Sequence, residues 1–348
     1  MRAFRLRAAA LALVLSPLLV QGCDSTVGPG TPPDGPAAPA PSGPALFPVM
    51  QDGTRALMDA TGRVVVTLEG YSATRPGGEG LTPARKWDGQ RNVWDFFDAS
   101  GTPVFRIAAD EVDAPRQGLI RIRIDGRSGF VDPIGRFIVN PYLYDARSFQ
   151  EDHARVKTTG SRWGFMDRSG RVVVDPQWSD LADLSGGRAR FRSNDLYGYI
   201  SATGEELIPA VYADARSFAG GLAAVREGQR WFYIDGQNAR TMGSTTFISA
   251  GDFSDGLAPV RTENLWEYID AAGARVIGPQ FDEARAFVDG LAAVRIGSAW
   301  TFIDRAGTPI RPPEFDEVAD FEGGLAAVQV NGATGYIDRS GAYVWIPR

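Results

Sequence analysis

The stretch Gly221–Arg226 reads Gly-Leu-Ala-Ala-Val-Arg, and Trp231–Asp235 after it reads Trp-Phe-Tyr-Ile-Asp. Further copies begin at Gly256 and Gly290, a spacing of about 34 residues, and weaker copies extend the series to about nine. A unit of this size cannot bury a core alone, so the chain is predicted to be a tandem array of stacked repeats. Arrays present surface, and we therefore expect function to lie on a surface rather than in one catalytic pocket.

Each repeat carries an apolar residue, Asp, two further residues and Gly, as in Ile269-Asp270 with Gly273. Asp at the start and Gly at the end of four residues indicate a type I turn, and the flanking apolar runs make it a hairpin. Two repeats deviate, because Ser201 replaces the Asp and Asn238 replaces the Gly. Asn also tolerates the left-handed backbone region, so the second exception fits the same turn.

Three strands per repeat follow: Leu222–Arg226, Trp231–Asp235, and a third such as Ala274–Ile277. Proline cannot donate to a ladder, so we expect Pro279 to end the third strand, and Pro176, Pro209 and Pro312-Pro313 to end it in other repeats.

The segment 281–287 alternates apolar and polar residues and adds at most a fourth short strand. No stretch shows a sustained helical period. The predicted fold is all-β, a tandem array of about nine antiparallel β-meander repeats of about 34 residues, either an open curved array or a propeller-like ring. The open array is favoured because no repeat is split between the two termini.

The first 22 residues have the features of a secretory signal. Arg2, Arg5 and Arg7 precede an apolar run from Ala8 to Val20, which is too short to span a bilayer. Leu-Val-Gln-Gly-Cys at 19–23 resembles the bacterial lipobox, which implies acylation of Cys23. An ordinary signal peptide is the alternative.

The mature chain is predicted to have two parts: lipidated Cys23 with a tether to residue 45, and a repeat domain over 46–348. The tether, residues 24–45, contains seven prolines and four glycines. Cys23 is the only cysteine, so the fold contains no internal disulfide. These features indicate a lipoprotein at a bacterial membrane, facing the periplasm or the exterior.

Charge restricts the partners. The chain has 36 basic and 42 acidic residues, a net charge of −6, and loss of the three signal arginines lowers it to −9. An acidic protein without a basic run is a poor candidate for nucleic-acid binding. We expect the membrane, reached through the lipid anchor, and an envelope protein or glycan as partners.

Trp-Gly-Phe-Met-Asp-Arg-Ser-Gly at 163–170 resembles the bacterial WG repeat, and residues 197–200, 279–284 and 335–338 carry parts of the same pattern. The resemblance extends from Leu46 to the C terminus and is clearest from Asp145. WG repeats resemble interaction modules without shared catalytic residues. The resemblance therefore implies an architecture and a binding or scaffold role, and transfers no site.

Two columns of repeated residues are candidates for binding. The first is aromatic and includes Trp163, Trp231, Trp266 and Trp300. The second is basic, at the end of the preceding strand, and includes Arg226, Arg261 and Arg295. Indoles could stack on sugar rings, or they could be core between repeats with guanidinium groups stacked on them. The loops beside them differ between repeats, so we expect binding there.

Catalysis has little support. His153 is the only histidine, and with one cysteine, assigned to lipid, the sequence indicates no metal site and no cofactor. A glycoside hydrolase needs only two carboxylates and is the alternative function, with the loop Gly70–Lys86 as its candidate position.

Overall fold

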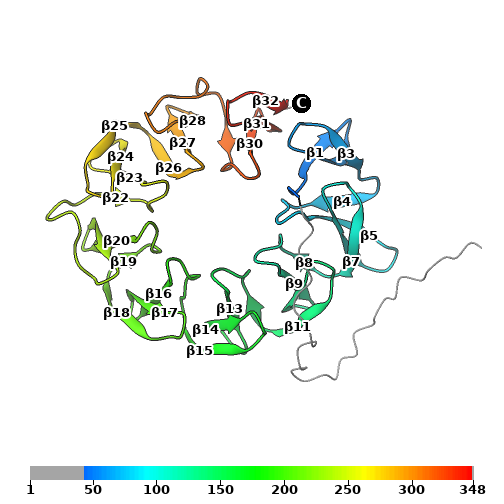
Figure 1. Cartoon of the computed structure of the whole chain (residues 1–348), viewed down its shortest axis with the longest axis horizontal. Coiled ribbons are helices and arrows are strands. Elements are labelled where there is room, and N and C mark those ends of the chain that lie inside the picture. Colours follow the sequence, from blue (N-terminus) through cyan, green and yellow to red (C-terminus); the bar gives the residue numbers. More distant parts are fainter. Residues whose placement is uncertain (1–42, 347–348) are drawn as a thin grey trace, which may run out of the picture. The chain divides into compact units, whose positions relative to one another are not determined.

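The computed structural model describes residues 43–346, and this part of the chain forms strands and no helix. Its strands form nine small antiparallel sheets, which lie around a ring (Figure 1). The fold is a nine-bladed β-propeller, which confirms the predicted all-β repeat architecture. Residues 43–346 contain no helix long and apolar enough to cross a membrane. The predicted signal peptide, Cys23 and the tether up to Ser42 lie outside the described residues.

The blades are numbered in chain order. Blades 1 to 3 contain β1 (Phe47–Gln51), β2 (Thr54–Met58) and β3 (Val64–Thr67); β4 (Tyr71–Thr74), β5 (Thr82–Trp87), β6 (Asn92–Phe97) and β7 (Pro103–Ala108); β8 (Glu111–Val112), β9 (Ile120–Ile124), β10 (Arg127–Val131) and β11 (Phe137–Leu143). Blades 4 to 6 contain β12 (Asp145–Ala146), β13 (His153–Lys157), β14 (Trp163–Asp167) and β15 (Val172–Trp178); β16 (Arg188–Ser193), β17 (Leu196–Ser201) and β18 (Glu206–Tyr212); β19 (Asp214–Ala215), β20 (Leu222–Glu227) and β21 (Arg230–Asp235). Blades 7 to 9 contain β22 (Ser249–Ala250), β23 (Leu257–Arg261), β24 (Trp266–Asp270) and β25 (Arg275–Phe281); β26 (Glu283–Val288), β27 (Leu291–Ile296) and β28 (Ala299–Ile303); β29 (Glu317–Val318), β30 (Leu325–Val330), β31 (Ala333–Asp338) and β32 (Tyr343–Trp345).

Blade 7 shows the complete design, with strand order β22-β23-β24-β25. We call these the first to fourth strands of a blade. The first strand has two residues, the second and third form a hairpin, and the fourth follows the Asp-x-x-Gly turn. In Figure 1 the fourth strands β11, β15, β18 and β25 lie at the outer rim of the ring.

The predicted turn is confirmed. In blade 7 the amide of Gly273 donates to the carbonyl of Asp270 over 2.9 Å, and the Asp270 carboxylate accepts the amide of Ala274. Both exceptions keep this arrangement. The Ser201 hydroxyl accepts the amide of Glu205 as the carboxylate would, and Asn238 has a φ of 66°. Ser201 in place of Asp and Asn238 in place of Gly therefore leave the turn unchanged.

The prediction that proline ends the third strand of the meander was wrong. That strand, the fourth of a blade, runs through Pro279 in β25 and through Pro176 in β15. It pairs on one side only, and its register shifts between the partners of Trp266 and Tyr268. In an edge strand with a bulge the backbone N–H that proline lacks is not needed for a ladder hydrogen bond.

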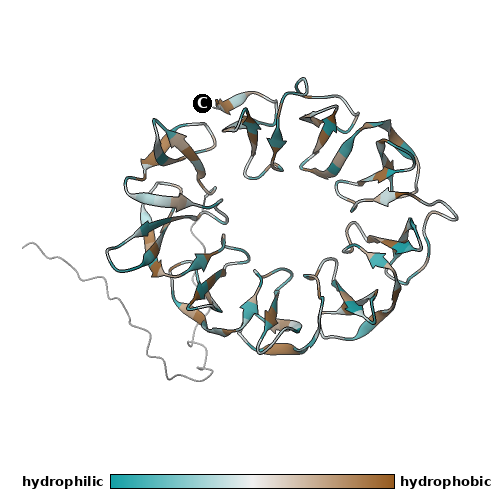
Figure 2. Ribbon diagram, turned by 180° about the vertical axis from the view of Figure 1, so that it is seen from behind, coloured by the Kyte–Doolittle hydropathy of each residue, from teal (hydrophilic) through white to brown (hydrophobic). Residues whose placement is uncertain are grey.

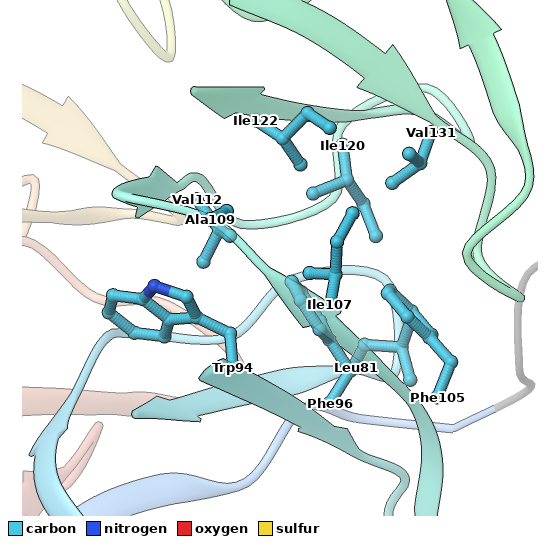
Figure 3. Packing of buried hydrophobic residues seen from close by; sticks show 10 residues of the cluster. All are labelled: Leu81, Trp94, Phe96, Phe105, Ile107, Ala109, Val112, Ile120, Ile122 and Val131. Carbon is cyan, nitrogen blue, oxygen red and sulfur yellow. The ribbon is translucent and has the colours of Figure 1, made fainter. Parts of the chain in front are cut away.

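The hydrophobic core lies between blades. Figure 3 shows it between blades 2 and 3, where Trp94 and Phe96 of β6 pack with Val112 and Ile122 of the next blade. Figure 2 shows both hydrophobic and hydrophilic segments in every part of the ring. The aromatic residues two positions after the Trp column are all buried: Phe96, Phe165, Tyr199, Tyr233, Tyr268 and Phe302. These side chains therefore belong to the core.

The ring is closed between blade 9 and blade 1, an interface that we call the seam. The Tyr336 hydroxyl donates to the carbonyl of Pro48 over 2.9 Å, and the ring of Phe47 packs edge-on against Tyr336 at 5.6 Å. Of the two predicted arrangements the structure has the ring, and the preference for the open array was wrong. Closure needs no split blade because side chains of a three-stranded first blade make the contacts.

Candidate functional site

Each candidate tryptophan is paired with cations. Arg226 lies directly opposite Trp231 in the β20–β21 ladder, with its guanidinium carbon 5.9 Å from the indole centre. Arg261 and Trp266 repeat this at 5.7 Å. Over Trp163 the nearest cation is Lys157, whose Nζ lies 4.4 Å from the ring centre.

In blade 8 the arginine over the indole comes from the first strand, a position also used in blade 6, where Arg216 lies 5.7 Å from the centre of the Trp231 ring. Arg295 lies opposite Trp300 in the ladder, but the guanidinium over the ring, at 4.6 Å, belongs to Arg285. The cation comes from β26, the first strand of the same blade. Stacking is therefore a property of every candidate indole, although the partner changes.

The four tryptophans are not brought together. They lie in four separate interblade clusters, and their indoles pack with core residues there. Trp163 is buried, whereas Trp231, Trp266 and Trp300 are half-buried. The structure therefore forms no continuous aromatic ladder from these residues. The exposed edges of three of them remain separate points on the ring.

The arginines differ in their counterions. Arg226 pairs with Asp214 at 3.6 Å and Arg295 with Glu283 at 2.6 Å, in each case across the ladder from the first strand. In blade 7 the same position holds Ser249, whose hydroxyl is 3.4 Å from Arg261. Arg261 therefore faces a neutral residue where its equivalents face an acid.

The loops beside the Trp column are short and exposed. In blade 6 the ladder continues to the pair Glu227 and Arg230, so only two residues form the tip. All four loop residues are exposed, as are most of 262–265 and 296–299. The side chains of these loops are free to differ because the ring does not use them for packing.

A second set of turns was missed by the sequence analysis. The first and second strands are joined by two-residue turns in which both residues have positive φ, such as Asp255 and Gly256. The Glu151 carboxylate of one such turn accepts both amides of Gly186 and Gly187 in the next blade, at 2.7 and 2.9 Å. These contacts connect neighbouring blades. An acid directly before glycine, as in Asp255-Gly256, was the sequence signal for these turns. It was overlooked because the recurring acids were already assigned to the Asp-x-x-Gly turn.

The segment Gly70–Lys86, predicted to be a loop, is mostly the strands β4 and β5, and it contributes to a buried ionic cluster. Asp95 is buried and accepts hydrogen bonds from Arg106 and Tyr71. It also forms an ion pair with Lys86 at 3.2 Å. Burial raises the pKa of Asp95, but the hydrogen bonds from Arg106 and Tyr71 outweigh it and hold the pKa below its ordinary value. Glu79 of the same segment binds the amide of Gly118 at 2.8 Å. Both carboxylates are engaged by protein groups.

His153 accounts for no site. It lies at the start of β13, where other blades have leucine, and its Nδ1 is 2.8 Å from the carbonyl of Glu151. Within residues 43–346 no group of three or more His, Cys, Asp or Glu side chains is placed to hold a metal ion.

The geometry defines a β-propeller whose blades are held by interblade aromatic cores and whose loops are exposed. The model of the WG containing repeat matches residues 129–160, 163–197, 197–231, 247–266, 268–298 and 300–332. The chain belongs to this family of WG-repeat proteins. No curated protein matches the sequence.

Several solved structures are similar to this chain at low sequence identity. A eukaryotic initiation factor superposes with a TM-score of 0.58 at 10% identity, over 86% of this chain and 95% of that one. The dihydro-heme d1 dehydrogenase NirN has a TM-score of 0.46 at 14% identity, over 76% of this chain and 72% of its own. KlHsv2 with loop 6CD replaced by a Gly-Ser linker has a TM-score of 0.42 at 10% identity, over 64% of this chain and 89% of its own. At these identities the likeness concerns the fold alone.

Proposed function

We propose that this protein is a membrane-anchored lipoprotein of the bacterial envelope and acts as a non-catalytic binding or scaffold module. The binding role is supported by the contrast between constant and variable parts of each blade. The strands, turns and aromatic columns hold the ring, whereas the loops beside the Trp column, such as Glu227–Arg230, are exposed and differ between blades. Repeat proteins separate a constant scaffold from variable recognition in this way.

The partner is an envelope protein or glycan, and not a nucleic acid. The net charge of −6 for the whole chain repels phosphate backbones. A glycan would stack on half-buried indoles such as Trp231, but a guanidinium already lies over that ring. This favours a protein partner that contacts the loop tips.

The anchor is tested at Cys23. Cys23→Ser should move the protein from the membrane fraction to the soluble fraction and abolish metabolic acyl labelling, because two or more acyl chains are needed for stable attachment. Ser25→Ala is the matched control and should leave both unchanged. Retention of Cys23→Ser in the membrane, with labelling intact, would refute the lipoprotein assignment.

The surface is tested by capture of partners from envelope extract with the full chain. Replacing Glu227–Arg230 with Gly-Ser-Gly-Ser, and likewise 262–265 or 296–299, should leave the thermal unfolding transition in place and weaken capture of a specific partner. Unchanged capture by all three variants would exclude the loops. Hydrolysis of a cell-wall glycan that one Asp→Asn change abolishes would instead support the hydrolase alternative.

A further inference from the structure

Blade 1 is the one blade in which no residue of the described range 43–346 lies at the position of the first strand. In blade 7 that strand is β22, which pairs with β23 through Ala250 and Val260. Blade 1 begins with β1, which pairs only with β2. Among residues 43–346, none pairs with the edge of β1 that a first strand would cover.

The other interfaces show what fills this position. The segment after the first strand of blade 7 puts Phe253 against Tyr233 of blade 6, with ring centres 4.9 Å apart. The Tyr233 hydroxyl donates to the carbonyl of Gly251 in the same segment. Blades 4 and 6 carry an identical sequence here, Asp-Ala-Arg-Ser-Phe, at 145–149 and 214–218. The position thus accepts an extended segment that ends in an aromatic residue.

At the seam a cavity of about 310 Å³ lies at this position, lined by Leu46, Phe47, Gly323, Ala327 and Tyr336 among others. Ala327 is half-buried, whereas its equivalents Ala224 and Ala293 are 1% and 2% exposed beneath the next blade. Phe47 lies where other blades have alanine, such as Ala258, and fills part of the space from β1. The remaining volume is at the lower end of ligand pockets.

Pro44, which lines the cavity with Gly43 and Ala45, is poorly suited to the turn that would follow a first strand. The register of β1 aligns Pro44 with Asp255, the first residue of the two-residue turn in blade 7. Asp255 has a φ of 50°, and proline is fixed near −65°. The backbone instead turns toward blade 2, where Leu46 pairs with the Thr82 hydroxyl.

We propose that the seam binds an extended segment of a partner protein, which adds to β1 as the missing first strand and inserts an aromatic side chain beside Phe47 and Tyr336. Strand addition to an open edge is an established mode of peptide recognition. The exposed acid Glu322 borders the cavity beside Asp320, which pairs with Arg285 at 3.7 Å, and Glu322 favours a segment with a basic residue near the aromatic one. This inference rests on the proposed binding function and names a site for it.

The probe is a labelled peptide with the repeat sequence Asp-Ala-Arg-Ser-Phe-Ala-Gly, capped at both ends, titrated against the full chain by fluorescence anisotropy. The same peptide with Phe→Ala is the control and should bind about tenfold more weakly, since an aromatic anchor dominates such contacts. Ala327→Trp should fill the cavity and weaken binding by about tenfold or more. Phe47→Ala, which restores the residue found in other blades, should strengthen it.

No binding of the peptide to the folded full chain would overturn the proposal. Binding that neither Ala327→Trp nor Phe47→Ala changes would place the peptide elsewhere and overturn the proposal. A chain that binds only after residues 31–42 are replaced by Gly and Ser would show that this chain occupies its own seam. Self-association that Ala327→Trp removes would identify a second copy as occupant, and overturn the proposal likewise. Capture that none of the three loop variants weakens, together with intact peptide binding, would refute the loop surface and leave the seam proposal standing.

Discussion

The Tyr336 hydroxyl donates to the carbonyl of Pro48 across a separation of 288 residues. In a complete blade the carbonyl at this place in the second strand accepts a backbone amide from the first strand, as Pro259 accepts Gly251. Blade 1 has no such amide among the described residues. A side-chain hydroxyl from the preceding blade therefore replaces a backbone donor, and this substitution lets a three-stranded blade close the ring.

Tyr336→Phe should lower the free energy of unfolding by about 1 kcal/mol, because Pro48 loses its donor at a site that water can reach. Tyr233→Phe is the matched control. Its acceptor, the carbonyl of Gly251, lies in a buried interface, so the cost there should be larger, about 1–3 kcal/mol. Urea unfolding measures both. An equal or greater cost at Tyr336 would contradict the more open seam.

Gly164→Ala should destabilise the protein by about 1–3 kcal/mol, because a Cβ there would meet the carbonyl of Val174 and the backbone must move. This is the glycine of the Trp-Gly pair. Gly278→Ala is the control, since a Cβ at Gly278 meets nothing within 4 Å and its φ is ordinary. That change should be neutral or stabilising by up to about 1 kcal/mol. Thermal unfolding would distinguish them, and similar transitions would show that close approach is not why glycine is needed.

Asp252→Asn should stabilise the protein more at neutral than at acidic pH. Burial raises the pKa of Asp252 above 3.8, and Arg216 and Arg190 offset this only in part. A carboxyl with a raised pKa in the folded state loses its favourable contribution as the pH rises through that value. Unfolding measured at about pH 3 and about pH 7 should show the gap between variant and parent growing with pH.

Asp59→Asn should have the opposite effect on stability, because the pKa of Asp59 is lowered rather than raised. The hydrogen bond from the Thr61 side chain is the main reason that the pKa of Asp59 falls from 3.8 to about 2. Its contribution is present above the ordinary value and is lost as the pH falls toward 2, so Asp59→Asn should cost stability at neutral pH and less in acid. The same trend for both variants would show that neither pKa controls the dependence.

Ser249→Asp should stabilise blade 7 by about 0.2–1 kcal/mol, because it puts an acid opposite Arg261 as Asp214 lies opposite Arg226. Ser249→Asn, of the same size without the charge, should gain less. The difference should shrink in high salt. A difference that salt does not affect would show that the ion pair is not its cause.

The sequence was sufficient for the local parts of the fold. The Asp270–Gly273 turn and the pairing of Arg226 with Trp231 follow from residue types and from the period of a strand, so both could be predicted. Closure could not, because it depends on the angle between blades and on Phe47 reaching across from β1. The role of Gly164 was hidden for a similar reason, since it is set by a carbonyl on the neighbouring strand.

The candidate site was predicted as residue columns, and these are where expected within each blade. What the sequence could not show is that Trp163, Trp231, Trp266 and Trp300 belong to four separate interfaces. Periodicity predicts equivalence between repeats, whereas a site depends on distance. That no residue of 43–346 forms a first strand in blade 1 was equally hidden. First strands of two residues, such as Asp214–Ala215, are too short to give a recognisable sequence pattern.

Closure also constrains how such a gene can change. In an open stack each repeat contacts only its neighbours, so a duplicated or deleted repeat leaves the remaining contacts as they were. In this ring one added blade would alter the angle at every interface and separate Tyr336 from Pro48. Copy number is therefore a property of the whole molecule, and we expect viable variants to exchange blades rather than to gain or lose them.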